Sequence, residues 1–166
     1  MTYPTIRYVC GDATFPHAVP AMIVHCCNHL GYWGAGFTNA LDRRWPHVGK
    51  AYKTWAREAI DRGTPRMLGE VQYVEAEDDI TVANLVGQDG IRGVNNIRPV
   101  RYAALGEGFQ MIAGVVITRL FTRRGAPTLH MPRIGCGLAG GTWDKVEPLV
   151  QAYLCDRGIE VTVYDP

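Results

Sequence analysis

A glycine-rich turn between residues 130 and 144 is the part of this sequence whose residue types most directly predict chemistry. The apolar run Leu129–Ile134 predicts a strand, and Thr142–Cys155 has the pattern of a helix. Four glycines, at positions 135, 137, 140 and 141, lie between them. Because glycine has no Cβ, successive backbone N–H groups can close around an anion beside the positive end of the following helix. Pyrophosphate is the expected occupant, although glycine turns also join strands to helices without binding anything.

The glycine spacing also matches G-x-G-x-x-G, the fingerprint of dinucleotide-binding folds. In those folds the motif opens the first βαβ unit, and an acidic residue that binds ribose follows about 20 residues later. Here the motif lies late in the sequence, with Pro166 soon behind it. We therefore expect an anion cradle without a Rossmann fold.

A second glycine loop, Asn28–Gly36, follows the apolar run Ala21–Cys26 and precedes the expected helix Phe37–Trp45. Two strand-to-helix turns that expose N–H groups can hold one ligand from two sides, at the carboxyl ends of the strands of an open α/β sheet. Within this loop, Tyr32 and Trp33 have the size to wall a nucleoside. They would serve equally well to anchor the loop.

Composition and charge narrow the function class only a little. The 17 basic and 16 acidic residues give a formal charge of +1, so no global field favours general nucleic-acid or membrane binding. There is no run of 18 apolar residues and no basic-then-apolar leader, so we expect a cytoplasmic protein with no membrane partner. The cysteine spacing lacks the paired C-x-x-C sets of a zinc site, so no metal is expected. Four cysteines lie in or beside apolar runs, as reduced core thiols do: Cys10, Cys26, Cys27 and Cys136.

Strand and helix patterns alternate without a linker-like break, which predicts one domain over residues 1–166. The expected strands are Ile6–Cys10, Ala21–Cys26, Gly69–Ala76, Ile80–Val86, Leu129–Ile134 and Val161–Tyr164. The expected helices are Phe37–Trp45, Val48–Ile60, Arg101–Arg124 and Thr142–Cys155. Acidic residues 77–79 predict a hairpin, Pro46 separates the first two helices, and Gly125 caps the third. This is the pattern of an α/β protein whose mixed sheet has helices on both faces.

Several of these segments together resemble the macrodomain family. They are Gly11–Thr14, His25–Asn28, Trp33–Gly36, Met131–Leu138 with Trp143, and Val161–Tyr164. Their order and spacing hold over nearly the whole chain. The resemblance implies a three-layer α/β/α fold with a mixed central sheet and a pocket for ADP-ribose, with no cofactor. The expected partner is thus an ADP-ribose-containing small molecule or an ADP-ribosylated macromolecule.

The resemblance also implies which residues bind the ligand. In macrodomains the acidic residue matching Asp12 hydrogen-bonds the adenine amino group, and the two glycine loops hold the distal ribose and the diphosphate. The implied binding residues are Asp12, Ala13, Gly31, Tyr32, Trp33, Gly34, Ala35, Gly36, Gln88, Arg133, Ile134, Gly135, Cys136, Gly137, Leu138, Ala139, Gly140, Gly141 and Trp143. Arg133 could equally be a solvent-facing strand residue.

The sequence departs from two catalytic branches of the family. Mono-ADP-ribosyl hydrolases and O-acetyl-ADP-ribose deacetylases carry an aspartate after the first glycine loop, where this chain has Thr38 and then Asn39. Terminal ADP-ribose protein glycohydrolases use a lysine and an aspartate where Gln88 and Ala139 stand. An amide cannot form a Schiff-base-like adduct and a methyl group cannot transfer a proton, so that mechanism is not expected.

The stretch from residue 25 to residue 52 resembles the yeast-type ADP-ribose-1″-phosphate phosphatases. It shares their His-x-Cys-Asn motif, their Trp-Gly-x-Gly loop and the turn at residues 44–46. This resemblance implies His25 as a catalytic residue, with Asn28 as the second candidate. A histidine beside a phosphate cradle can accept a proton from attacking water, but His25 could instead be a buried, hydrogen-bonded strand residue. His29, Gln88, Asp144 and Arg133 are secondary candidates, and Asp144 also suits a helix N-terminus.

Three functions follow from the sequence. The first is a metal-independent phosphatase that acts on ADP-ribose-1″-phosphate. The second is a hydrolase that releases ADP-ribose from a modified protein or nucleic acid. The third is a module that binds ADP-ribose without turning it over. A diphosphate cradle serves all three.

The implied role of Asp12 gives a first prediction. Isothermal calorimetry with ADP-ribose should show one site with micromolar-range affinity. Asp12→Ala should weaken binding about ten- to hundred-fold, because a hydrogen bond to a charged group contributes roughly 1.5–3 kcal/mol. Unchanged affinity would contradict the placement of adenine beside Asp12.

Overall fold

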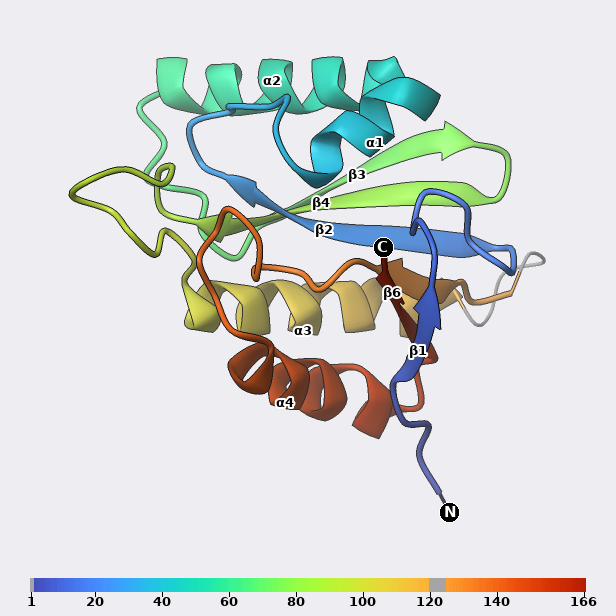
Figure 1. The fold of residues 1–166 in the computed structure, drawn as a ribbon. Helices are drawn as coiled ribbons and strands as arrows, with labels where there is room; N and C mark the ends of the chain where they lie inside the picture. Colours follow the sequence, from blue (N-terminus) through green and yellow to red (C-terminus); the bar gives the residue numbers. More distant parts are fainter. Residues whose placement is uncertain (1, 120–124) are drawn as a thin grey trace.

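The computed structural model describes residues 2–119 and 125–166. These residues form a six-stranded sheet, and helices lie on either side of it (Figure 1). The strand order is β1-β6-β5-β2-β4-β3, and within this sheet β3 alone runs antiparallel to its neighbour. The strands are β1 (Arg7–Cys10), β2 (Ala21–Asn28), β3 (Val71–Glu77), β4 (Ile80–Gln88), β5 (Thr128–Met131) and β6 (Val161–Asp165). The helices are α1 (Phe37–Arg44), α2 (Pro46–Asp61), α3 (Tyr102–Arg119) and α4 (Trp143–Tyr153), with a 3₁₀ turn at Cys155–Arg157. The predicted α/β fold with a mixed sheet is confirmed.

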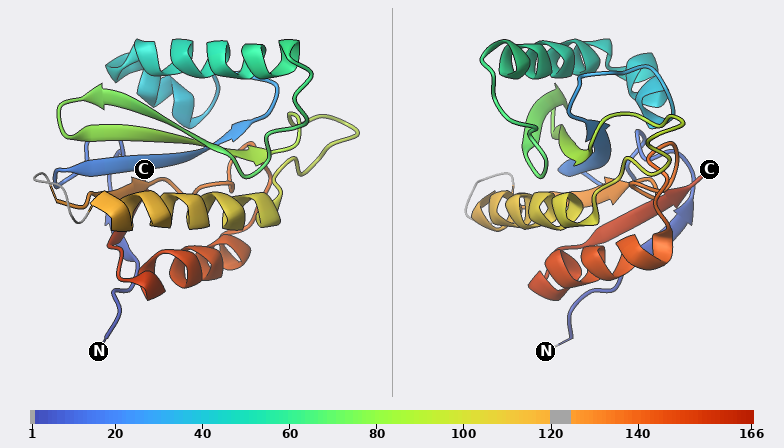
Figure 2. Two further views of the ribbon diagram at one scale, coloured as in Figure 1. Left: turned by 180° about the vertical axis from the view of Figure 1, so that it is seen from behind. Right: turned by 90° about the vertical axis from the view of Figure 1, so that its left-hand side faces the viewer.

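Helices α1 and α2 cover one face of the sheet, and α3 and α4 cover the other (Figure 2). The interior strand β2 is buried along almost its whole length, as its continuous apolar run predicts. Ala21 and Ile23 belong to the core cluster under α1 and α2, while Met22 and Val24 belong to the cluster under α3 and α4. No helix in the described residues is long and apolar enough to cross a membrane.

The observed elements differ from the predicted ones mainly at their ends. Helix α2 begins at Pro46 rather than at Val48, because a proline without an N–H suits the first turn of a helix. Strand β5 ends at Met131, directly before Pro132, which cannot donate to a sheet ladder. The predicted hairpin is present, and Asp79 has a positive φ of 63° at its turn. The end of the third predicted helix and its cap at Gly125 involve residues 120–124, which lie outside the described residues.

The cysteines differ in their surroundings. Cys27 is a buried core thiol, as predicted, but Cys26 and Cys136 are only partly buried. The prediction is wrong for Cys10, which is exposed because it lies on β1, the strand at the edge of the sheet.

Two histidines lie inside the packed sheet. His25 on β2 is 1% exposed, and its Nε2 contacts Oδ1 of Asn84. His130 on β5 is fully buried, with Nε2 2.8 Å from Oγ1 of Thr128 and Nδ1 2.7 Å from the hydroxyl of Tyr164. Burial disfavours the charged ring and lowers the pKa of each histidine from 6.5 to about 4.

These two lowered pKa values predict acid sensitivity. The unfolded chain takes up protons at its histidines near pH 6.5, whereas the folded chain takes them up only near pH 4, so stability is complete above pH 6.5 and falls as the pH drops towards 4. Urea unfolding should give about 2 kcal/mol less stability per histidine at pH 5 than at pH 7. His130→Gln should lose about half of this pH dependence. Equal unfolding free energies at the two pH values would contradict the assignment.

Candidate functional site

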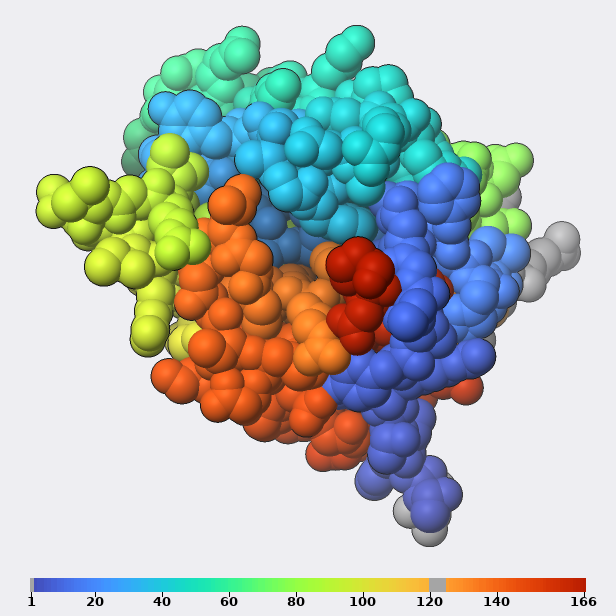
Figure 3. Space-filling view, in the orientation of Figure 1, coloured from blue at the N-terminus to red at the C-terminus, as the bar shows by residue number. Residues whose placement is uncertain are grey.

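A cavity of about 560 Å³ opens at the carboxyl ends of β2, β4 and β5. Its walls come from the segments that follow these strands, at residues 28–38, 88–92 and 132–139. Figure 3 shows the hollow between the light-blue, yellow-green and orange segments. Because β2, β4 and β5 run parallel, their carboxyl ends lie side by side. This is where a ligand site is expected in an open α/β fold.

Side chains shape the first glycine loop. The amide of Asn28 donates from Nδ2 to the carbonyl oxygen of Tyr32 (2.9 Å) and accepts the Tyr32 N–H at Oδ1 (3.0 Å). Oγ1 of Thr38 accepts the N–H groups of Gly34 and Ala35, both at 3.0 Å. Among the described residues no side-chain hydrogen bond caps α1, and its first residues Phe37 and Thr38 line the cavity together with Gly36.

Asn28 is positioned by a bulge and by a tyrosine. The β2–β4 register shifts between Cys27 and Asn28, which places Asn28 opposite Gln88 at the ends of the two strands. The buried Tyr52 hydroxyl donates to the Asn28 carbonyl oxygen. With both ends of its amide bonded to Tyr32, Asn28 fixes the loop, and its predicted catalytic role stays a prediction.

The second glycine loop presents backbone rather than side chains. Among the hydrogen bonds of the described residues, none uses the N–H groups of Gly137, Leu138 or Ala139. A Cβ added at Gly137 would meet no described atom within 4 Å, so this position faces open space. Consecutive free N–H groups beside a cavity form an anion-binding concavity.

Gly140 and Gly141, unlike Gly137, lie against neighbouring backbone. Gly140 has a φ of 77°, and a Cβ there would lie 2.8 Å from the carbonyl oxygen of Ile97. A Cβ on Gly141 would lie 2.5 Å from the carbonyl oxygen of Gly135. Both glycines permit close backbone packing behind the loop.

The cavity unites most of the predicted binding residues. Lining it are His25, Asn28, Tyr32, Trp33, Ala35, Gly36, Gln88, Arg133, Ile134, Gly135, Gly137, Leu138 and Ala139. Within the described chain, the predicted residues that do not line it are Asp12, Ala13, Gly31, Gly34, Cys136, Gly140, Gly141 and Trp143. Lining residues that sequence reasoning missed as site residues are Cys26, Cys27, Phe37, Thr38, Ile91, Arg92 and Pro132. Ile91 and Arg92 come shortly after the carboxyl end of β4, beside the end of β2. Their position after this strand could have marked them as site residues from the sequence.

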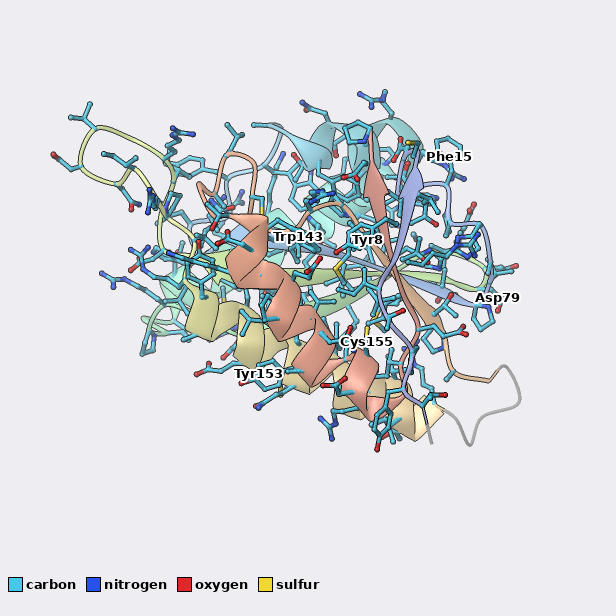
Figure 4. All side chains as sticks on the ribbon, turned by 60° about the horizontal axis from the view of Figure 1, so that its bottom comes forward. Tyr8, Phe15, Asp79, Trp143, Tyr153 and Cys155 are labelled. Carbon is cyan, nitrogen blue, oxygen red and sulfur yellow. The ribbon has the colours of Figure 1, made fainter. Side chains whose placement is uncertain are left out.

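Arg133 is held at the cavity edge by its surroundings. Its Nε and Nη2 donate to the two carboxylate oxygens of Asp165, at 2.6 and 3.0 Å. The guanidinium carbon lies 5.4 Å from the ring centre of Tyr8 and 5.5 Å from that of Trp143. Trp143 donates from its indole to the Tyr8 hydroxyl at 2.9 Å, beside β1 (Figure 4). Trp143 therefore supports Arg133 from outside the cavity.

Asp12 bonds within its own loop. Its Oδ1 accepts the backbone N–H and the hydroxyl of Thr14, both at 2.8 Å, as in an Asx turn. Among the described residues, no hydrogen bond uses Oδ2 of Asp12. This oxygen is free to accept from a ligand, so an adenine contact stays a prediction.

His25 lies beneath the loop. Asn84 donates from Nδ2 to Gln72 (3.0 Å) and turns its Oδ1 toward Nε2 of His25, so the neutral ring carries its proton on Nε2. The other ring nitrogen, Nδ1, is 3.8 Å from Sγ of Cys27. The ring packs edge-on against Trp33, with 5.4 Å between centres.

Asp89 and Cys26 are two further ionisable residues at or next to the cavity. Asp89 is within 3.7 Å of Arg66, Arg101 and His29. Burial raises the pKa of the Cys26 thiol to about 12, so this lining thiol stays protonated and is no nucleophile. In the described part of the chain, no three His, Cys, Asp or Glu side chains are grouped to hold a metal ion.

The fold and the site together define a three-layer α/β protein with a cavity between two glycine loops, where the described N–H groups of Gly137, Leu138 and Ala139 have no hydrogen-bond partner. The chain is 44% identical to a macrodomain protein from Streptomyces coelicolor, with a TM-score of 0.81, over 97% of this chain and 99% of that one. It belongs to the macrodomain family. No family model matches it.

Other relatives extend this comparison. Chromodomain-helicase-DNA-binding protein 1-like from Danio rerio is 31% identical over 98% of this chain, which spans only 16% of that relative's length. ADP-ribose 1″-phosphate phosphatase from Lodderomyces elongisporus is 24% identical over 88% of this chain and 91% of its own. Thermosipho africanus DarTG, solved in complex with ADP-ribose, is 18% identical with a TM-score of 0.73, over 98% of this chain and 42% of that one. At that identity the likeness concerns the fold alone.

The two kinds of glycine in the second loop predict opposite effects of substitution. Gly137→Glu places a negative charge in open space beside the free N–H groups, so the chain should fold normally and lose ADP-ribose binding. Gly140→Ala should instead lower the free energy of unfolding by about 1–3 kcal/mol, because its φ is positive and its Cβ meets backbone. Calorimetry and thermal unfolding of both variants test this. Normal binding by Gly137→Glu would reduce the loop to a structural turn.

Proposed function

We propose that this chain binds ADP-ribose, or a derivative of it, in the cavity between the two glycine loops. The observation that carries this proposal is the row of unpaired N–H groups at Gly137, Leu138 and Ala139, across the cavity from the uncapped start of α1. A diphosphate is the group that such an arrangement stabilises best. The aromatic side chains of Tyr32 and Trp33 supply apolar wall for a ribose or base.

Catalysis is a second proposal, supported by the phosphatase relatives that match nearly their full length. The proposed reaction is hydrolysis of ADP-ribose-1″-phosphate, in which a water oxygen attacks phosphorus and the bond from phosphorus to the ribose oxygen breaks. Backbone N–H groups at the start of α1 would stabilise the phosphoryl oxygens, because they are fixed before the ligand arrives. The leaving ribose oxygen takes up a proton, and phosphate departs.

His25 would act in this reaction as the proton acceptor for water. Its pKa of about 4 keeps the ring neutral at pH 7, and Asn84 leaves Nδ1 as the unprotonated nitrogen. The same burial makes His25 a weak base and keeps it beneath Trp33, so the proposal requires water to reach Nδ1 past that ring. A positioning role, in which His25 supports Trp33 and Phe37, is the alternative.

A matched pair of histidine variants separates these roles. His25→Ala should lower kcat for phosphate release by about 10²–10⁴ while ADP-ribose affinity stays within a few-fold. His130→Ala is the control, because His130 is equally buried and its pKa is equally lowered, but it does not line the cavity. Both variants should lower the melting temperature, whereas His25→Ala alone should lower turnover. Undiminished phosphate release by a folded His25→Ala chain would remove His25 from the chemistry.

A further inference from the structure

Three polar side chains form a row across the sheet, on the face that α1 and α2 cover. His25 on β2 pairs in register with Asn84 on β4, and Asn84 pairs in register with Gln72 on β3. Side chains that are paired in this way share one face of the sheet and lie within contact distance of one another. His25 and Asn84 are buried, whereas Gln72 is half-buried on the edge strand. The row therefore connects the edge of the sheet with the cavity.

The rows on either side of this one are apolar. Ile23 pairs with Val82 in the row before it. Cys27 pairs with Val86 in the row after it, and all four side chains are buried in the core clusters on this face. An apolar pair in the middle row would fit the same layer and leave no hydrogen bond to be made. Packing alone therefore does not account for the polar row.

The direction of the hydrogen bonds along the row is fixed at its outer end. Nε2 of Gln72 donates to the carbonyl oxygen of Ala51 (3.2 Å) in α2, the helix that lies over β3 (Figure 1). A carbonyl oxygen can only accept, so the amide oxygen of Gln72 is the end that accepts from Nδ2 of Asn84 (3.0 Å). The amide oxygen of Asn84 then faces His25 and accepts from its Nε2. Each amide thus passes the polarity of the α2 carbonyl to the next side chain.

Among the described residues, no other hydrogen-bonding neighbour of the His25 ring distinguishes its two nitrogens. Sγ of Cys27 lies 3.6 Å from Nε2 and 3.8 Å from Nδ1, and a thiol is both a weak donor and a weak acceptor. Burial raises the pKa of the Cys27 thiol and that of the Tyr52 hydroxyl, so both groups stay neutral at pH 7. Trp33 and Phe37 contact the ring only through their aromatic rings. The choice of tautomer therefore falls to Asn84.

We propose that Gln72 and Asn84 are positioning residues that hold His25 in the Nε2–H tautomer, with the direction set by the Ala51 carbonyl of α2. The lone pair of the neutral ring then lies on Nδ1, the nitrogen that accepts the proton in the proposed reaction. Neither amide lines the cavity, so both act on the chemistry only through His25. This catalytic consequence rests on the proposed function, whereas the tautomer does not.

Substitutions at position 72 keep, remove or reverse the direction of the row. Gln72→Glu keeps an acceptor beside Asn84, so the Nε2–H tautomer should persist. Gln72→Leu removes the acceptor without supplying a donor, so both tautomers should be present. Gln72→Lys supplies a donor, so Asn84 should turn its oxygen to the lysine and its Nδ2 to His25, and the ring proton should move to Nδ1. The half-buried position on an edge strand leaves room for all three side chains.

Nitrogen NMR of the imidazole rings at pH 7 reads the tautomer of the ligand-free chain. Signals that are absent from His25→Gln identify His25 among the five histidines. Gln110→Lys is the matched control, because it makes the same exchange at an exposed position of α3, across the sheet, and it should keep the wild-type tautomer. One and the same tautomer in the wild type, Gln72→Leu and Gln72→Lys would overturn the proposal, as would a wild-type ring protonated on Nδ1.

Turnover gives a second readout. In Gln72→Lys, kcat for phosphate release should fall about 10²–10⁴-fold, as in His25→Ala, because a protonated Nδ1 cannot accept a proton from water. Affinity for ADP-ribose should stay within a few-fold of the wild type, and Gln110→Lys should keep both values. Unchanged kcat in a Gln72→Lys chain whose tautomer has switched would remove the catalytic consequence. If the wild type releases no phosphate, the catalytic proposal fails by itself, and the NMR spectra still decide whether Gln72 sets the tautomer.

Discussion

The burial of β2 on both faces and its pairing on both edges is the constraint on which the site depends. Its partners β4 and β5 run parallel to it, so the carboxyl ends of all three strands lie side by side. The segments that follow these strands therefore surround the same space. The strand cannot shift by one residue without moving His25 from the α1 and α2 side to the other core. The cavity therefore has fixed walls before any ligand arrives.

Within those walls, polar side chains hold the loops in place, and the backbone N–H groups remain for a ligand. Asn28 and Thr38 use their polar atoms on the first loop, and Asp165 holds Arg133. The groups left for a ligand are mostly backbone N–H groups, which carry partial positive charge, do not titrate and cannot rotate away. In the proposed function such a site would recognise an anion by geometry. Among the described lining residues, His25 is the side chain to which the proposal gives a proton transfer, so the proposed catalysis depends on that one buried ring.

Three positions at which this sequence differs from the catalytic branches of the family can be explained from the structure. Thr38 closes the first loop by accepting the N–H groups of Gly34 and Ala35. Ala139 is buried, and its carbonyl oxygen accepts the N–H of Val100, while its own N–H has no hydrogen-bond partner among the described residues. Gln88 lies opposite Asn28 at the strand ends. At these positions the chain has loop-forming and neutral groups in place of charged ones.

Sequence reasoning alone predicted most of the elements, the family and the positions of the two glycine loops, because apolar periodicity and glycine position are local signals. It assigned Tyr32, Trp33 and Gly137 to one cavity correctly. Only the tertiary structure separated Gly137 from Gly140, since the difference is the approach of the Ile97 backbone from a distant segment. The same holds for Trp143, which bonds to Tyr8 and packs against Arg133 from outside the cavity. It also holds for Ile91 and Arg92, which line the cavity because the parallel strands end side by side. Contacts between segments far apart in the chain depend on packing, and no local pattern encodes them.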